Sequence, residues 1–292
     1  MRRFLRAAAI RVLSRPSTIN YNEPCIIKNA ISHWPAVRLR RWHPRRLQVT
    51  YGDRLFEFGR GVHSNQTLLT TLERFCNLKH PHTRRQCYIF DSTFDADCPE
   101  LLDDYNIPAW FQFDGSHHVS NVQCSYRWLL MGHAGSGSHL HTDPPLTSAW
   151  NALAYGLKEW VVIQPVTTED QQQPELHQAL SAFNKRMLER AAAAPLNRWF
   201  LKHVPRLWCH AQCVASADSG RCSASGERAT QTTVQHTPRM MRFLQRPGDI
   251  VYIPTGWLHA VLNRSLSVAV THNFIFPECA RTSSQAQAAR GR

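Results

Sequence analysis

The cysteines lack the spacing of a disulfide framework or a zinc finger. Nine of them are scattered along 292 residues, an odd number without a Cys-x-x-Cys pair. This usage favours a reduced, intracellular chain, nuclear or cytoplasmic, over a secreted one. Cys209, Cys213 and Cys222, with His210 nearby, could suggest zinc, but their spacing fits no common structural zinc site.

Long apolar runs and acidic residues are also scarce. No run approaches the roughly 20 residues that cross a bilayer, so we expect no membrane association. Lys and Arg number 34 against 21 Asp and Glu, a formal net charge of +13. The excess favours acidic partners such as nucleic acid, through weak association, or anionic protein tails. The alternative is a basic surface without a dedicated nucleic-acid site, because the charge is dispersed and no compact nucleic-acid module is visible.

The first nineteen residues contain no acid. Residues 1–19 combine several arginines with an Ala-rich centre, which is the composition of a mitochondrial transit peptide. The same composition suits a basic first helix that leads into the domain. A secretory signal is disfavoured because Arg6 and Arg11 interrupt any apolar core.

Short apolar stretches separated by Gly and Pro turns dominate what is present. They predict strands within 50–60, 88–91, 126–132, 138–164, 250–254 and 266–271, and favour an all-β barrel or jelly roll. Apolar spacings of three or four predict helices at 66–78 and within 168–198. We expect one domain over 20–277, a flexible Ser/Ala/Thr/Gln-rich insertion at about 209–238, and a disordered tail at 278–292. Trp42, within an Arg-rich stretch, is interpreted as a core anchor rather than a nucleic-acid stacking residue.

Metal-ligating residue types occur at strand spacing in Ser138-His139-Leu140-His141-Thr142-Asp143. His141 and Asp143 stand two apart, so on a strand both point the same way. A histidine and a carboxylate on one face supply two ligands of a facial Fe(II) triad. His259, set among apolar residues, is the candidate third ligand; its alternative is a core histidine with satisfied hydrogen bonds. His139 lies on the predicted face of His141, but the His-x-Asp spacing favours His141, and we expect His139 at the pocket mouth or a solvated strand end.

Ordered motifs over about 20–277 resemble the Jumonji-C family of Fe(II)- and 2-oxoglutarate-dependent oxygenases, within the cupin superfamily. The resemblance is strongest to the branch of arginine demethylase and lysyl-hydroxylase, the former phosphatidylserine-receptor proteins. The motifs are Tyr88-Ile89-Phe90-Asp91-Ser92, Leu101-Leu102-Asp103-Asp104-Tyr105, Tyr126-Arg127-Trp128 with Met131-Gly132, His141-x-Asp143-Pro144, Thr147-Ser148-Ala149-Trp150-Asn151-Ala152-Leu153, Gly156-x-Lys158-x-Trp160, Pro247-Gly248-Asp249, Gly256-Trp257-x-His259 and Thr271-x-Asn273-Phe274.

The resemblance implies a mainly β fold with flanking helices, a double-stranded β-helix or jelly roll, and an iron site made by His141, Asp143 and His259. It implies 2-oxoglutarate and dioxygen as co-substrates, with Lys158 as the cation for the distal carboxylate; the alternative is an ordinary strand-edge lysine. The further residues that match co-substrate contacts are Thr271, Tyr88, Asn151, Ser138 and Asn273. Ser138 stands where the branch usually has Thr and keeps the hydroxyl.

The implied function is hydroxylation of a protein side chain, either lysyl hydroxylation or N-methyl-arginine demethylation, on a basic protein such as a histone. Two alternatives remain open. One is a non-catalytic cupin scaffold that binds protein or RNA through its basic surface. The other is an oxygenase that acts on tRNA or a small molecule.

Overall fold

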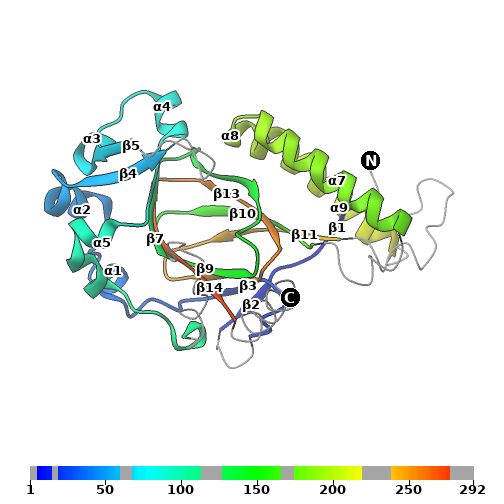
Figure 1. Cartoon of the computed structure of the whole chain (residues 1–292), viewed down its shortest axis with the longest axis horizontal. Helices are drawn as coiled ribbons and strands as arrows, with labels where there is room; N and C mark the ends of the chain where they lie inside the picture. Colours follow the sequence, from blue (N-terminus) through cyan, green and yellow to red (C-terminus); the bar gives the residue numbers. More distant parts are fainter. Residues whose placement is uncertain are drawn as a thin grey trace, which may run out of the picture.

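A computed structural model of the chain describes residues 5–14, 19–59, 68–112, 127–165, 174–218 and 238–276. Two β-sheets enclose the centre of the molecule, and helices lie outside them (Figure 1). One sheet has five strands in the order β1-β11-β10-β13-β8, and the other has nine in the order β2-β3-β12-β9-β14-β7-β6-β4-β5. The mainly β, jelly-roll class predicted from the sequence is confirmed.

Period-two alternation divides the five-stranded sheet into an inner and an outer face. On its central strand, Trp160 and Val162 pack toward the other sheet, whereas Val161 and Ile163 pack against helices. Its neighbours pair antiparallel with it. The strands are β1 (Arg6–Ala7), β11 (Arg239–Gln245), β10 (Lys158–Ile163), β13 (Leu258–Asn263) and β8 (Gly137–His141).

The nine-stranded sheet is covered on both faces, so β9, one of its inner strands, is buried at almost every position. On that strand Trp150 and Ala152 belong to the outer core, and Asn151 faces the inside between them. The strands are β2 (Arg11–Leu13), β3 (Cys25–Ile27), β12 (Ile250–Ile253), β9 (Thr147–Tyr155), β14 (Ser267–Ile275), β7 (Arg127–Gly132), β6 (Tyr88–Asp91), β4 (Leu55–Gly59) and β5 (Leu68–Thr71).

Gly156 makes the turn that joins β9 to β10 and so connects the two sheets. Its φ is +96°, a left-handed conformation that glycine adopts without strain, and a Cβ there would meet Leu266 O at 2.3 Å. The chain therefore crosses from Asn151 on one sheet to Lys158 on the other through a turn that excludes larger residues.

Short helices cover the outer face of the nine-stranded sheet. Trp42 is 1% exposed, and its Nε1–H donates to Asp104 Oδ2 over 3.0 Å, which confirms its interpretation as a core anchor. These elements are α1 (Pro35–Arg38), α2 (Pro44–Tyr51), α3 (Leu72–Cys76), α4 (Pro81–Gln86), α5 (Phe94–Asp97) and the 3₁₀ turns η2 (Pro99–Asp104) and η3 (Ala109–Phe111). The helix predicted over 66–78 is wrong at its start, where residues 68–71 form the strand β5 instead.

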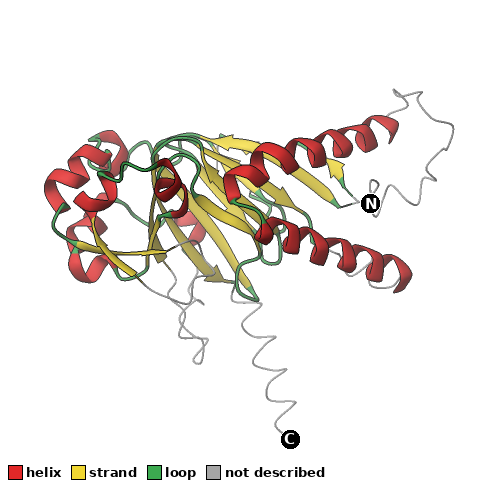
Figure 2. Cartoon of the chain, turned by 90° about the horizontal axis from the view of Figure 1, so that it is seen from above, coloured by secondary structure: helices red, strands yellow, loops and turns green. Residues whose placement is uncertain are grey.

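A helical insertion covers the five-stranded sheet on the side away from α1–α5 (Figure 2). It comprises α7 (Pro174–Ala193), α8 (Leu196–Arg198), the π-helical turn η4 (Trp199–His203) and α9 (Val204–Asp218). The prediction of a flexible insertion is therefore wrong for residues 209–218, while 219–237 and the predicted tail lie outside the described residues. Val204 and Ala211 lie seven residues apart on one face of α9 and are buried against the sheet. This packing stabilises the helix although the segment is mostly polar.

The basic N-terminal segment is part of both sheets. Arg6–Ala7 runs parallel to β11, and Arg11–Leu13 runs parallel to β3. The backbone bonds include Ala8 N–H to Met240 O at 2.9 Å and Lys28 N–H to Leu13 O at 2.9 Å. The alternative of a first helix is thus wrong for these residues, because the edge strands of two sheets offer unpaired backbone groups that a strand can satisfy.

We predict that Leu13→Ala lowers the free energy of unfolding by about 2 kcal/mol or more, because Leu13 is 6% exposed and packs in the outer core. Its neighbour Val12 is 56% exposed, so Val12→Ala is the matched control and should change stability by less than about 0.5 kcal/mol. Urea unfolding measures both. Equal, negligible effects would show that the segment is dispensable for folding.

Candidate metal centre

The three residues proposed as metal ligands come together from two neighbouring strands. β8 and β13 pair antiparallel, and the register sets His259 opposite His141. Asp143 follows directly after β8, with Oδ1 3.9 Å from His141 Nε2 and Oδ2 3.9 Å from His259 Nε2. The candidate ligand atoms all lie within 4.8 Å of one another. One metal ion could therefore bind all three.

Backbone carbonyls orient both imidazoles for metal binding. His141 Nδ1 lies 2.6 Å from His139 O, and His259 Nδ1 lies 3.1 Å from Trp257 O. A carbonyl only accepts hydrogen bonds, so each Nδ1 carries the proton and donates it. The lone pair is then on Nε2, which is the nitrogen that faces Asp143 in both residues.

The placement predicted for His139 is wrong, and an irregularity in β8 gives the reason. Val261 pairs with Ser138 while His259 pairs with His141, so β8 has one extra residue between these two pairs. The bulge breaks the alternation: Ser138 and His141 line the interior, and the His139 ring instead bonds through Nδ1 to Ala191 O of α7 at 3.1 Å. His139 therefore docks the strand on the helical insertion.

A cavity of about 170 Å³ lies between the sheets beside the three ligands. The lining includes every residue predicted for the metal or co-substrate: Tyr88, Ser138, His141, Asp143, Asn151, Lys158, His259, Thr271 and Asn273. The structure thus gathers the complete predicted set, and it adds an apolar wall that the motif analysis did not assign. That wall includes Val251, Ile253 and Val261; the two-residue spacing of Val251 and Ile253 on β12, which places both on one face, was the available signal.

Lys158 is a buried cation in this cavity. It is 1% exposed, which excludes the strand-edge alternative, and its side chain forms no hydrogen bond or ion pair with another described residue. Burial lowers the pKa of its ammonium group from the usual value for lysine to about 7. The adjacent Glu159 is not its partner, because it points to the outer face and pairs with Arg242 at 2.6 Å and Arg264 at 3.3 Å.

Other polar groups of the cavity wall fit a small carboxylic acid. Asn151 Oδ1 is buried and has no hydrogen-bond partner among the described residues. The Thr271 hydroxyl donates to Trp150 O at 2.9 Å, and burial raises the pKa of the Tyr88 phenol, which therefore stays protonated. The Lys158 ammonium and the protonated Tyr88 hydroxyl beside the His-Asp-His group provide a positive charge and a hydrogen-bond donor, which an iron-chelating dicarboxylate requires.

Other candidate features are absent from the part of the chain that the structure describes. Cys209 and Cys213 are exposed on α9 and belong to no metal-binding group found among the described residues, and Cys222 lies outside them. No helix in the described ranges is both long and apolar enough to cross a bilayer.

Comparisons with known proteins agree with this geometry. A family model described as a cupin-like domain matches residues 14–277. The arginine-specific demethylase JMJ22 of Arabidopsis thaliana is 26% identical over 254 residues, 87% of this chain and 42% of that protein. The bifunctional arginine demethylase and lysyl-hydroxylase psr-1 of Caenorhabditis elegans is 28% identical over 86% of this chain and 55% of that protein. The 2-oxoglutarate and iron-dependent oxygenase JMJD4 of Mus musculus is 22% identical over 87% of this chain and 56% of that protein. The chain spans about half the length of these curated relatives.

We predict that His141→Ala and His259→Ala each weaken Mn(II) binding by roughly a hundredfold or more, because each removes a ligand. His139→Ala is the matched control: it removes a neighbouring imidazole that contacts α7, so Mn(II) affinity should stay within a few-fold of the parent. Titration calorimetry measures all three variants. A loss for His139→Ala as large as for His141→Ala would identify His139 as a ligand.

Proposed function

The chain belongs to the cupin-like domain family, and on that premise we propose that it is an Fe(II)- and 2-oxoglutarate-dependent dioxygenase that hydroxylates a protein side chain. The observation that carries the proposal is the His141–Asp143–His259 group in one cavity with the buried Lys158, whose side chain has no partner among the described residues. The names of the relatives, which include demethylases, a lysyl-hydroxylase and an oxygenase, support it.

The protein's own residues bind and orient the reactants. His141, Asp143 and His259 would hold Fe(II) on one side and leave its other positions to the co-substrate and dioxygen. Lys158 would bind the distal carboxylate of 2-oxoglutarate, with the Tyr88 and Thr271 hydroxyls as further contacts, and Asn151, Ser138 and Asn273 would complete the polar wall. Apolar side chains on the inner faces of the sheets exclude water from the site.

Bound Fe(II) with 2-oxoglutarate would supply the oxidation: one oxygen atom of dioxygen would go to succinate, formed with loss of CO₂, and the other to a substrate C–H, which would become C–OH. If the carbon is a side-chain methylene, the alcohol is stable. If it is an N-methyl carbon, the hydroxymethyl amine releases formaldehyde. Both outcomes, lysyl hydroxylation and N-methyl-arginine demethylation, follow from the same site, and a basic protein substrate is proposed from the relatives' names.

A non-catalytic scaffold that binds protein or RNA is the less favoured alternative. A scaffold has no need for three converging ligands or for a lysine buried beside them without a partner in the described ranges. An oxygenase that acts on tRNA or a small molecule would share the iron site and differ only in what enters the cavity.

We also propose the organisation and location of the chain. Residues 20–277 form the catalytic domain, to which the N-terminal strands are joined. The described cysteines are free, which supports a reducing compartment, nuclear or cytoplasmic. Mitochondrial import is the alternative; cleavage near residue 19 would remove both N-terminal strands.

The proposal predicts a metal-to-ligand charge-transfer band when the protein is mixed with Fe(II) and 2-oxoglutarate without oxygen. In air, mass spectrometry of Lys- and methyl-Arg-containing peptides should then show a gain of roughly 16 Da for hydroxylation or a loss of roughly 14 Da for demethylation. His141→Ala is the control and should give neither the band nor succinate. A parent protein without the band, or full succinate production by the variant, would refute the iron assignment.

The pKa of Lys158 predicts how co-substrate binding depends on pH. A bound carboxylate requires the ammonium form, and the pKa of free-enzyme Lys158 is about 7, so binding above pH 7 takes up a proton. The 2-oxoglutarate dissociation constant, measured with Mn(II) in place of iron, should be nearly constant below pH 7 and rise by up to about tenfold per pH unit above it. Lys158→Met should bind weakly at every pH and lose this dependence. A parent profile that is flat from pH 6 to 9 would place the anchor elsewhere.

A further inference from the structure

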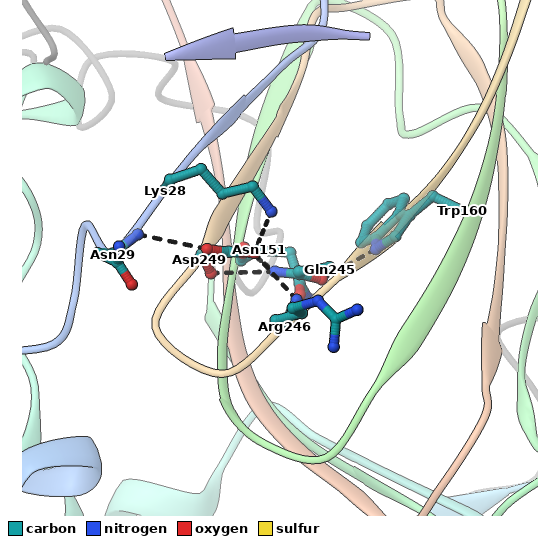
Figure 3. Close-up of polar contacts among 7 residues, drawn as sticks. All are labelled: Lys28, Asn29, Asn151, Trp160, Gln245, Arg246 and Asp249. Atoms are coloured by element: carbon teal, nitrogen blue, oxygen red, sulfur yellow. Dashed lines mark hydrogen bonds and ion pairs between the residues drawn. The ribbon is translucent and has the colours of Figure 1, made fainter. Parts of the chain in front are cut away.

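Gln245, the last residue of β11, lies between the two sheets next to the cavity. It is 0% exposed, and both the oxygen and the nitrogen of its side-chain amide form hydrogen bonds. Oε1 accepts the indole Nε1–H of Trp160 at 2.9 Å, and Nε2 donates to the backbone carbonyls of Asn151 at 2.9 Å and Asp249 at 3.2 Å (Figure 3). The indole nitrogen only donates and the carbonyls only accept, so the amide has a single satisfied orientation.

The partners of Gln245 are two walls of the cavity that belong to different sheets. Trp160 on β10 and Asn151 on β9 both line it. The indole ring of Trp160 stacks against the ring of the proposed ligand His259, with centroids 6.1 Å apart and an interplanar angle of 28°. The indole ring also stacks against the Phe243 ring, with centroids 6.3 Å apart and an interplanar angle of 1°. Gln245 therefore fixes the rotation of a ring that contacts a metal ligand.

The turn that follows Gln245 is itself held in place. Asp249 Oδ2 accepts hydrogen bonds from Lys28 Nζ at 2.8 Å and from the Arg246 backbone N–H at 3.0 Å, and its Oδ1 accepts from the Asn29 backbone N–H at 3.3 Å (Figure 3). Asp249 is 2% exposed, so these charge-assisted bonds lie in a largely desolvated place. The backbone from which the Gln245 side chain extends is thus anchored to the end of β3.

We propose that Gln245 is a positioning residue for 2-oxoglutarate: it ties Trp160 to the backbone of Asn151 and so holds the two walls of the cavity at a set spacing. The inference rests on the proposed function. It explains why an amide is buried at a place where a hydrophobic side chain would pack, because only a group that both donates and accepts can bridge an indole N–H and two carbonyls.

The test compares three variants of the full chain. Gln245→Met keeps the side-chain volume and removes all three hydrogen bonds. Trp160→Phe removes the indole N–H together with part of the ring system and keeps one aromatic ring, so it serves if Gln245→Met does not fold. Met240→Ala is the control: it lies on the same strand, is 0% exposed and packs against the helical insertion, so it lowers the melting temperature without touching the cavity.

Two measurements follow. Calorimetry with Mn(II) and 2-oxoglutarate should show the dissociation constant of 2-oxoglutarate raised about tenfold by Gln245→Met and less by Trp160→Phe, since one net hydrogen bond corresponds to roughly a decade in an equilibrium constant. Met240→Ala should leave it unchanged. In protein with ¹⁵N-labelled tryptophan, the Trp160 indole N–H signal, assigned by its loss in Trp160→Phe, should shift and exchange faster in Gln245→Met.

The outcomes separate the inference from the function beneath it. If the parent does not bind 2-oxoglutarate in the presence of Mn(II), the proposed function fails and the inference falls with it. If the parent binds but Gln245→Met and Met240→Ala have the same affinity, only the inference is overturned. An unchanged Trp160 indole signal in Gln245→Met overturns it independently of any ligand.

Discussion

The pairing of β8 with β13 is the interaction on which the candidate site depends. It brings His141 and Asp143 to His259 across a long sequence separation, and a slip of one residue would turn His259 to the other face of the sheet. The outer face of the same two strands prevents such a slip. Leu140, Leu258 and Leu262 are buried there under the helical insertion, so the register that hides these leucines is also the register that brings the ligands together. Apolar packing on one side of the sheet thus determines metal chemistry on the other.

The interior of the barrel combines this rigid frame with polar groups that it does not satisfy. Burying the Lys158 ammonium disfavours its charged form, which is why its pKa falls to about 7, and Asn151 Oδ1 has no partner among the described residues. A fold selected only for stability would replace such groups by hydrophobic ones of similar volume. Their retention beside the His-Asp-His group is the physical reason to expect a charged ligand in the cavity.

Much of the site could be predicted because strand periodicity and the family's motifs place side chains on faces. The residues predicted to bind the metal and the co-substrate all line one cavity. The placement predicted for His139 was wrong because a bulge in β8 shifts the alternation by one residue. Nothing in the sequence of residues 138–141 indicates where that extra residue lies. The N-terminal strands could not be predicted, because such short segments become strands by pairing with a sheet edge in the folded protein and not through their own propensity. Helix α9 was missed because its buried face begins at Val204, before the polar segment that the sequence indicated to be flexible.

Gln245 shows why a buried bridging residue is the hardest kind to predict. Its sequence neighbourhood predicts only a strand that ends at a Pro-Gly turn, and a glutamine there is compatible with a solvated strand end. Its role depends on Trp160 and Asn151, which come from two other strands and approach it only after the sheets have packed. The metal ligands are recognisable in the sequence because histidine and aspartate are residue types that bind metals. The role of a residue that holds the cavity walls depends on contacts that exist only in the folded protein, so it can be inferred only from the structure.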